Sequence, residues 1–462
     1  MQSLRIVSLT LCSLALLAPT PQPATETWEK VVAPGFMFRM DVNHALPRTI
    51  VSVRMTPQAN GVAAIPALPG KTVFDASPTV GRGTVSQFVE QYEAFGGVNA
   101  DFFPFSSDRA TGDPLGFMAV DGELISAPGR PRSTFAWGPE ISQIGVVAMT
   151  ASLQVANGTP IRISGVNEEC PLNGVTLNSS VAGLALSKAP NVHVTLAPTT
   201  AKIPLDGTVT AKVIAVGSGS TSVPVPLGQW VLQANGTAGD QVKGLTVGTD
   251  VTVSIKCTGF DWSKTPNAVG GGPTLLSNGA NKITAKQEGF PDSFSVTRHP
   301  RTAVGRTKSG DIWWVVVDGR SKHSVGASLE ELAEIMRRLD CVDAINLDGG
   351  GSSAMVLGGT AVNHPSSNIQ RAVANGVVFK IPTVSDNPVK SIKTERKGAE
   401  IIATAIGADG QPLPNARVIW SCSGNAWIDQ AGTVRSLADG PIKVYAWCGG
   451  NRVETTVTLN AK

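Results

Sequence analysis

The sequence predicts an α+β fold, with a large strand-rich domain built on a mixed sheet with few helices, followed by an all-β C-terminal domain. Three observations support this prediction. The 49 glycines and 31 prolines indicate frequent turns, as a strand-rich chain needs. Between residues 145 and 257 nearly every segment alternates apolar and polar residues, for example HVTLA and DVTVSIKC. Residues 311 to 362 read as strand, helix and strand.

Length and composition limit the function classes. A chain of 462 residues is too long for one ordinary domain, so two or three are expected. Its 42% hydrophobic and 16% charged residues are typical of a folded protein with a core. The formal net charge of +3 predicts no special attraction to nucleic acid or to an anionic membrane.

The N-terminus is typical of an export signal. Arg5 precedes an apolar run from Ile6 to Ala18, which is too short to span a bilayer comfortably. We therefore expect residues 1–24 to be a signal peptide, cleaved between Ala18 and Ala24. A buried N-terminal helix is the alternative. No later apolar run is long enough to be a transmembrane segment, so we expect a secreted or periplasmic, envelope-associated protein.

The large domain should span residues 28–382, including the strand-rich segment 145–257. Strand-like segments such as RTIVSVRM come first. A helix follows, which Ser86 could cap and whose Phe88, Tyr92 and Phe95 share one face.

The segment from 311 to 362 contains two acids at strand ends. DIWWVVVDGR reads as a buried strand, SLEELAEIMRRL as a helix that begins with a capping box of Ser328 and Glu331, and DAINLDGGGSSAMV as a second strand. These lengths suggest a right-handed βαβ unit with parallel strands. Asp318 and Asp348 would then lie near each other at the carboxyl edge of the sheet, where ligands of α/β sheets commonly bind. An antiparallel arrangement would break this inference.

A domain boundary is expected near 382–389, which leaves residues 386–462 as an immunoglobulin-type sandwich. Alternation puts Val418, Trp420 and Cys422 on one face of a strand, and Ile442, Val444, Ala446 and Cys448 on one face of a later strand. A Cys422–Cys448 disulfide fits that pattern. Cys341 reads as a buried thiol, and Cys170 and Cys257 could pair. The run GTVRSLADGPIKVYAW resembles bacterial Ig-like group 2 modules, which are typically spacers or cell-wall contacts.

Several motifs together resemble the phosphodiester glycosidase family. In order along the chain they are GGVNADFF, GDPLGF, VDGEL, AVGGGPTLL, HPRTAVG, VVVDGR, SVGASLEEL, AINLDGGGSSAMV and QRAVANGVV. The resemblance covers roughly residues 30 to 380. It implies a hydrolase that acts on a sugar-1-phosphodiester and cleaves the bond between the sugar and the phosphate, in a glycan or sugar-phosphate polymer.

Such chemistry needs a carboxylate and a phosphate site. Asp348 is the first choice for the acting carboxylate, as nucleophile or as base for water; capping the following turn is its structural alternative. The next three residues could present successive N–H groups to an anion, and two serines add hydroxyl donors. Those five residues are Gly349, Gly350, Gly351, Ser352 and Ser353. No lysine follows the glycines, so a nucleotide loop is not indicated.

Asp318 is the second expected carboxylate, with a turn contact as its alternative. Arg301 and Arg371 are the expected phosphate clamps, and Arg320 is the third.

Other residues near these motifs are weaker candidates. Asn99, Asp101 and Asn346 are expected to bind substrate, while Phe102 and Phe103 are more readily explained as core than as a sugar platform. His299, and less so His364, could act as acid or ligand. No cofactor is expected, although Asp101, Asp318 and Asp348 could together hold a calcium ion.

Two other functions remain open. GGSSA at 350–354 imitates a nucleophile elbow, which would make Ser352 the nucleophile of a serine hydrolase, but an elbow needs a helix after the serine. A non-catalytic envelope protein that binds glycans is the other alternative.

Overall fold

The computed structural model describes residues 24–77, 80–104, 111–384 and 387–459. Apart from its last residue, the predicted signal peptide lies outside this range. Within the described residues, the model contains no helix with the length and apolarity needed to cross a membrane. The chain is strand-rich with few helices and ends in a further β domain, as predicted.

The central part is built on an eight-stranded sheet in the order β1-β2-β3-β22-β21-β23-β19-β20. Its strands are β1 (Thr25–Ala33), β2 (Phe36–Asn43), β3 (Arg48–Met55), β22 (Ile312–Val317), β21 (Arg301–Thr307), β23 (Cys341–Asn346), β19 (Thr274–Ser277) and β20 (Ala280–Asn281). Every neighbouring pair is antiparallel, so the expected mixed sheet is wrong for this part.

The two strands of the predicted βαβ unit run parallel, as expected, but they are not neighbours in the sheet. β22 and β23 both pair antiparallel with β21, which lies between them. They therefore run the same way and end at the same edge, but they share no hydrogen bonds. The intervening strand is the HPRTAVG segment, which precedes both in the chain.

Helix α4 (Leu329–Arg338) crosses from β22 to β23 and covers one face of this sheet. Ser328 and Glu331 form the predicted capping box, and Leu329, Leu332 and Met336 are fully buried. The short helix α3 (Asp292–Val296) contacts α4. Alternate residues of β22 point to opposite faces: Val315 packs in the core with α4, whereas Val316 packs in the core on the other side.

Two five-stranded sheets lie on that other side. The first contains β25 (Thr360–Ala361), β24 (Met355–Leu357), β5 (Gly96–Asn99), β26 (Gly376–Lys380) and β4 (Ala63–Ala67). The second contains β7 (Glu123–Ser126), β6 (Met118–Val120), β18 (Asn267–Gly270), β8 (Ser133–Trp137) and β9 (Ser142–Val146). Helix α1 (Val85–Gln91) packs on the first sheet, and its cap is Thr84 rather than Ser86.

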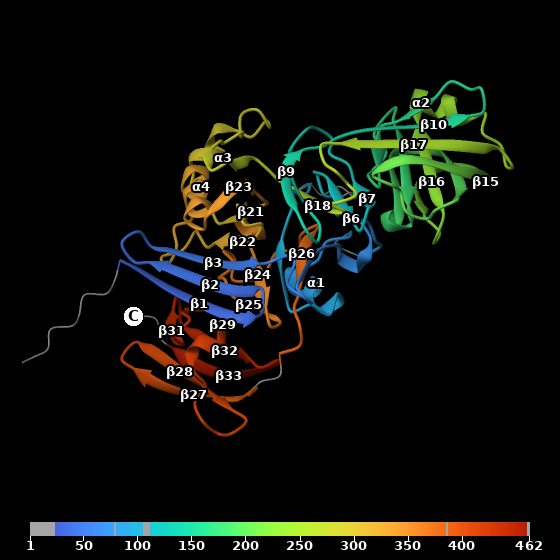
Figure 1. Ribbon diagram of the computed structural model, residues 1–462. Coiled ribbons are helices and arrows are strands. Elements are labelled where there is room, and N and C mark those ends of the chain that lie inside the picture. Colours follow the sequence, from blue (N-terminus) through green and yellow to red (C-terminus); the bar gives the residue numbers. More distant parts are fainter. Residues whose placement is uncertain (1–23, 78–79, 105–110, 385–386, 460–462) are drawn as a thin grey trace, which may run out of the picture.

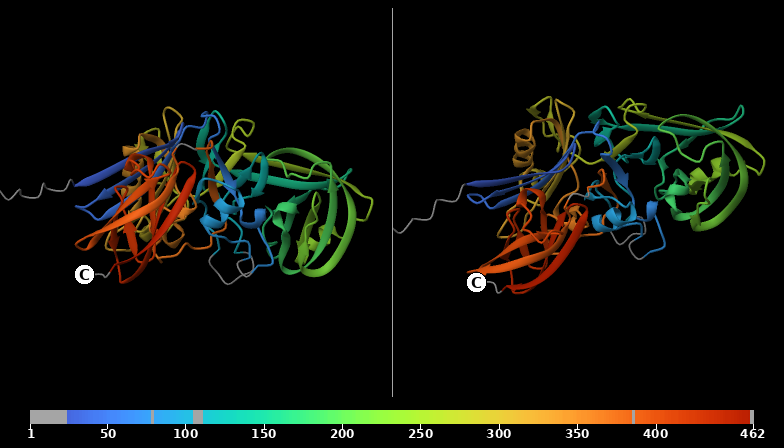
Figure 2. Two further views of the ribbon diagram at one scale, coloured as in Figure 1. Left: turned by 90° about the horizontal axis from the view of Figure 1, so that it is seen from below. Right: turned by 60° about the horizontal axis from the view of Figure 1, so that its bottom comes forward.

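Residues 148–258, the insertion, form a separate eight-stranded sheet with its own core. Its elements are β11 (Ile161–Ile163), β10 (Ala148–Val155), β17 (Asp250–Thr258), β15 (Asp206–Pro224), β14 (Leu184–Pro198), β16 (Trp230–Asn235), β13 (Val175–Ser179), β12 (Gly165–Val166) and helix α2 (Gly236–Val242). Figures 1 and 2 show the insertion and the C-terminal residues at opposite ends of the molecule, with the central part between them.

The C-terminal domain, residues 387–459, consists of two sheets around one core. One sheet holds β27 (Val389–Lys397), β28 (Glu400–Gly407), β31 (Thr433–Ser436) and β30 (Ala426–Ile428), and the other holds β29 (Ile419–Ser423), β32 (Gly440–Cys448) and β33 (Asn451–Leu459). Trp420 and Val444 face this core, as the alternation predicts.

The predicted Cys422–Cys448 disulfide is wrong. Neither cysteine forms a disulfide within the described residues, and neither do Cys170 and Cys257. Strands β29 and β32 are neighbours in one sheet, where Cys422 stands opposite Val444. Cys448 lies four residues further along, about 13 Å away at the usual rise per residue, whereas a disulfide needs Cα atoms within about 7 Å.

Candidate active site

The predicted site residues meet at the edge of the main sheet where β22 and β23 end and β21 begins. Arg301 stands opposite Val317, and Ala303 stands opposite Asn346. Asp318 and Asp348 follow these strands, so two interstrand spacings, about 10 Å, separate their backbones. They share the edge, but their side chains have different surroundings.

Asp348 is held by backbone and side-chain hydrogen bonds. Its N–H donates to the Ala100 carbonyl at 2.8 Å, and its carbonyl accepts from Asn99 Nδ2 at 2.7 Å. Asn99 Oδ1 accepts from Thr302 Oγ1 and from the Ala354 N–H, at 2.9 and 3.1 Å. Buried Asn99 thus ties both ends of the 348–354 loop to the sheet, which is a positioning role rather than the expected contact with substrate.

The Asp348 carboxylate is partly exposed and electrostatically perturbed. Burial raises its pKa to about 6, while hydrogen bonding from Ser352, the charge of Arg371 and the Gly349 N–H oppose that rise. Near neutral pH the group is mostly ionised, yet protonation lies within reach. These are properties of a carboxylate suited to act as nucleophile or base.

The glycine triplet makes room for arginines. A Cβ added at Gly350 would lie 3.1 Å from Arg320 Nη2, and one at Gly351 would lie 2.3 Å from Arg371 Nη2. At Gly349 the same atom would lie 2.8 Å from the Pro300 carbonyl oxygen and 3.8 Å from Arg301 Cδ. Gly350 and Gly351 therefore face the guanidinium groups of Arg320 and Arg371, and Gly349 faces the backbone at Pro300 and Arg301.

The loop does not present the expected row of free N–H groups. The Gly349 N–H bonds the Asp348 carboxylate, and the Gly350 N–H donates to the Pro300 carbonyl at 2.8 Å. The Ser352 N–H donates to the Gly349 carbonyl at 3.1 Å, closing a short 3₁₀ turn. The predicted nest is therefore wrong for Gly349 and Gly350, whose N–H groups already bond within the protein. The positive charge near the loop comes from arginine side chains instead.

Arg320 and Arg371 are the two arginines whose guanidinium groups face the glycines of the loop. Arg320 is exposed, has a left-handed backbone with φ of 60°, and places Nη2 3.3 Å from His299 Nδ1. Arg371 places Nη1 3.4 Å from Ser352 Oγ. Burial, Arg301 and Arg320 all lower the pKa of His299, so its ring is neutral at neutral pH.

Arg301 has a different role from the expected phosphate clamp. Its side chain is 1% exposed, and Nε and Nη2 donate to the carbonyls of Ala327, Phe294 and Thr297 at 2.6 to 3.0 Å. Its guanidinium also lies over the Phe294 ring, 4.6 Å from the centroid. Arg301 therefore ties the α3 region to the sheet edge.

Asp101 lies behind Asp348 and is 1% exposed. Its carboxylate accepts from the N–H groups of Phe102 and Gly116, both at 2.7 Å. Burial raises its pKa to about 7; Asp348 adds to the rise, and Arg132 opposes it. Arg132, which sequence reasoning missed, lies over the rings of Phe102 and Phe290 at 5.5 and 5.0 Å.

Asp318 is buried in a separate cluster. At 3% exposure, it accepts from Asn363 Nδ2 at 2.9 Å, from the His364 N–H at 3.0 Å, and contacts His323 Nε2 at 3.4 Å. Trp427 of the C-terminal domain stacks on His323 with 5.8 Å between centroids. The expectation that Asp318 and Asp348 face one cleft is wrong, because Asp318 organises this histidine cluster beneath the C-terminal domain.

The remaining candidates are structural. Asn346 is fully buried and donates to the carbonyls of Gly272 and Leu347, and Ser353 is held by Thr302. Ser352 is also fully buried, and the strand β24, not a helix, follows it, so a nucleophile elbow is absent. His364 has its pKa lowered by burial.

The calcium hypothesis receives no support from the geometry. Over the ranges that the structure describes, no three or more His, Cys, Asp or Glu side chains are grouped as metal ligands. Asp318 in particular belongs to a different cluster from Asp101 and Asp348.

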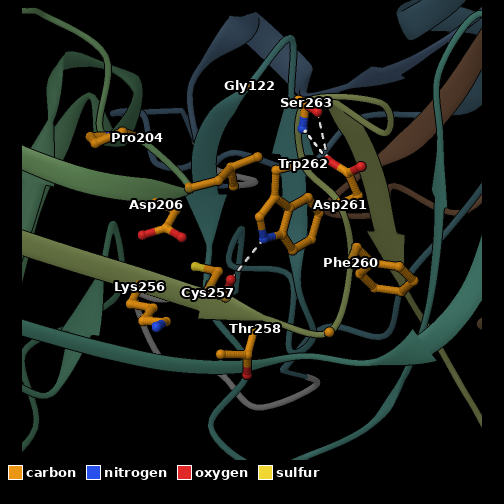
Figure 3. A pocket seen from close by; sticks show the side chains of 12 residues that line it. Gly122, Pro204, Asp206, Lys256, Cys257, Thr258, Phe260, Asp261, Trp262 and Ser263 are labelled. Atoms are coloured by element: carbon orange, nitrogen blue, oxygen red, sulfur yellow. Dashed lines mark hydrogen bonds between the residues drawn. The ribbon is translucent and has the colours of Figure 1, made fainter.

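A hollow of about 620 Å³ lies away from Asp348, where β17 leaves the insertion. Figure 3 shows the Trp262 indole at its centre, with Nε1 donating to the Cys257 carbonyl at 2.8 Å. The indole already packs against Phe117 and Phe260, at 5.1 and 5.2 Å between centroids. This tryptophan is thus part of the packing between the insertion and the central part.

A family model described as phosphodiester glycosidase matches residues 205–380. Mouse N-acetylglucosamine-1-phosphodiester alpha-N-acetylglucosaminidase is 46% identical over 70 residues, which are 15% of this chain and 13% of the mouse protein. The chain thus spans about an eighth of the length of the curated relatives that it matches, 13% in each case.

Two crystal structures are similar in fold. A "Putative exported protein" from Burkholderia pseudomallei K96243 has a TM-score of 0.60 at 26% identity, over 73% of this chain and 74% of that one. A hypothetical protein from Synechocystis has a TM-score of 0.61 at 24% identity, over 76% of this chain and 62% of that one. The matched residues, 205–380, contain Asp348, Arg320 and Arg371.

Proposed function

We propose that this protein is a glycosidase that hydrolyses sugar-1-phosphodiester bonds in a glycan or cell-envelope polymer. One observation carries the proposal: the Asp348 carboxylate lies beside a glycine loop against which two arginines, Arg320 and Arg371, are packed. An anionic group bound by these arginines would place the attached sugar beside the carboxylate. The match of residues 205–380 to the phosphodiester glycosidase family supports the same reaction class.

The reaction divides between the carboxylate and the arginines. The bond between the anomeric carbon and the phosphate oxygen breaks, and its electron pair leaves with the phosphate monoester. That leaving group is weakly basic, so strong general-acid assistance is unnecessary. Arg320 and Arg371 stabilise its charge. Ionised Asp348 either attacks the anomeric carbon or takes a proton from the attacking water. In both routes one water is consumed: its hydroxyl group ends on the anomeric carbon, and its remaining proton balances the phosphate monoester that leaves.

His299 is a positioning residue in this scheme. Its neutral ring can accept a hydrogen bond from Arg320 through Nδ1, at 3.3 Å. This contact orients a long, exposed arginine toward the loop. A replacement that keeps the ring nitrogen acceptor should preserve phosphate binding better than alanine.

Export belongs to the same proposal. The apolar run Ile6–Ala18 is typical of a signal peptide, and a similar solved structure is described as a "Putative exported protein". An exported enzyme of this type would meet phosphodiester-linked glycans in the cell envelope.

The decisive experiment measures turnover of a chromogenic sugar-1-phosphodiester. Wild type should release an aryl phosphate monoester, which an added phosphatase converts to the coloured phenolate, and Asp348→Asn should lose about 10³-fold or more in kcat, a loss typical of removing a catalytic carboxylate. Asp206→Asn, an exposed carboxylate in the insertion, is the matched control and should keep wild-type turnover. Equal binding of a glycan by wild type and Asp348→Asn, with cleavage by neither, would instead establish a binding protein. Labelling of wild type but not Ser352→Ala by a fluorophosphonate would establish a serine hydrolase.

A further inference from the structure

A cleft of about 650 Å³ lies between the sheet edge and the C-terminal domain. The turn at 320–323 contributes one wall, and Asn425, Trp427 and Arg435 contribute to the opposite wall. Neither the phosphodiester chemistry at Asp348 nor the domain contacts account for this space.

The lining of the cleft is cationic. None of its lining residues is Asp or Glu. Arg435 is neutralised by Glu400 and Asp429, each 2.7 Å away. In contrast, no ion pair is found for Arg320 or Lys322 anywhere in the described parts of the chain, and both side chains are exposed. The cleft therefore has two uncompensated positive charges and several amide and hydroxyl groups, a composition that suits an anionic glycan.

The wall of the cleft is fixed in place. His323 stacks on Trp427 with an interplanar angle of 17°, and the Arg435 guanidinium lies over Trp427 at 4.9 Å. Asn368 Nδ2 donates to Asn425 Oδ1 across the domain boundary at 2.5 Å. A cleft whose walls are tied together before a ligand arrives loses little entropy on binding.

Arg320 joins this cleft to the Asp348 loop. It lines the cleft, and it also packs on Gly350 and contacts His299. A chain of sugar phosphates that places one phosphodiester at Asp348 would run past Arg320 toward Lys322.

We propose that the interdomain cleft is a second anion-binding subsite, which holds a neighbouring phosphate of a polymeric sugar-phosphate glycan. This inference rests on the proposed function and adds that the natural substrate is an anionic polymer, read by both domains. The C-terminal domain then supplies one side of the substrate path, through Asn425, Trp427 and Arg435.

The test compares a polymer of sugar-1-phosphate repeats with the short chromogenic phosphodiester. In Lys322→Glu, kcat/KM for the polymer should fall about tenfold more than kcat/KM for the short substrate, since one favourable charge contact becomes repulsive. Lys308→Glu is the matched control, because Lys308 is an exposed lysine on the β21–β22 turn at the opposite edge of the same sheet. It should leave the ratio of the two values at that of wild type. An equal ratio in all three proteins would overturn the proposal.

A binding arm separates this proposal from the proposed function. Titration calorimetry with the same polymer and the Asp348→Asn protein should give an affinity that falls with salt and falls further when Lys322→Glu is added. This result supports the subsite even if no substrate is cleaved. Inorganic phosphate that binds as tightly as the polymer, and is lost in Lys322→Glu, would show a free-anion site and overturn the polymer assignment. Neutral dextran binding equally well would also overturn it.

Discussion

The glycines at 349–351 illustrate how an absent side chain positions a charged one. Gly351 has backbone angles that alanine tolerates, but its missing Cβ is the space that Arg371 occupies. Gly349, in contrast, abuts the backbone carbonyl of Pro300. A methyl group at position 351 should therefore displace a flexible side chain, whereas one at position 349 should strain the backbone.

Gly351→Ala should reduce activity without unfolding the protein. The added Cβ, 2.3 Å from Arg371 Nη2, pushes the guanidinium away from Ser352 and Asp348. Misplacing a binding group by about 1 Å can cost on the order of 10²-fold in rate, so kcat/KM should fall by roughly that factor. In the Arg371→Ala background the same change should add little, because the two act through one group. Additive losses of kcat/KM in the double variant would contradict this interpretation. Gly349→Ala, in contrast, should lower the melting temperature of the protein.

The pH dependence of activity should report on Asp348. Its ionised form is the reactive one, so kcat/KM should fall about tenfold per pH unit below the pKa, which is about 6. Because the charge of Arg371 lowers the pKa of Asp348, Arg371→Gln should move this acid limb to higher pH. Steady-state kinetics between pH 4 and 8 measure both effects. An acid limb unchanged by Arg371→Gln would show that the limb belongs to another group.

At the scale of elements, the crossover through α4 decides where the two acids lie. The capping box begins the helix at the residue that the sequence indicates, and Glu331 also pairs with Arg48 at 2.8 Å. The helix therefore connects the sheet edge to the neighbouring β3 turn. Its position fixes the end of β22, from which the 318–324 turn starts.

Ser328→Ala should destabilise the protein without altering the site. Loss of the cap, whose hydroxyl accepts from the Glu331 N–H at 3.2 Å, typically costs about 1 kcal/mol in the free energy of unfolding. Urea denaturation measures this change. Ser328→Thr keeps a capping hydroxyl and should stay close to wild type. A Ser328→Ala protein as stable as wild type would mean that the capping hydrogen bond contributes nothing net.

At the scale of the molecule, the C-terminal domain is docked firmly on the central part. Trp447 packs edge-on against Phe95 at 4.8 Å, and Gly358 leaves room for its ring. Buried Lys30 donates to the carbonyls of Val418 and Gln430, and burial lowers its pKa to about 7. Apolar and polar contacts together hold the domain where it covers Asp318 and borders the interdomain cleft.

Trp447→Ala should loosen this docking. Removing a packed tryptophan in this setting should cost roughly 2–4 kcal/mol, toward the lower end of the usual range because the ring is only partly buried. Calorimetry should then resolve a C-terminal transition below the main one, whereas wild type should unfold in a single step. A single transition at the wild-type temperature would show that this contact does not couple the domains.

The sequence by itself determined the strand-rich class, the buried strand β22, the core-facing residues of β32 and α4, the capping box, and the two acids at one sheet edge. These features follow from periodicity and local hydrogen bonding, which act within a few residues. The motifs that resemble the phosphodiester glycosidase family also pointed to the stretch that contains Asp348.

Only the tertiary structure decided which neighbours each of these residues has. It placed β21 between β22 and β23, put both cysteines in one sheet, buried Arg301 and Asp318, and brought Arg132 near Asp101. These are contacts between segments far apart in the chain. Local pattern carries no information about them, because strand order and domain docking are set by how the whole set of apolar faces is buried.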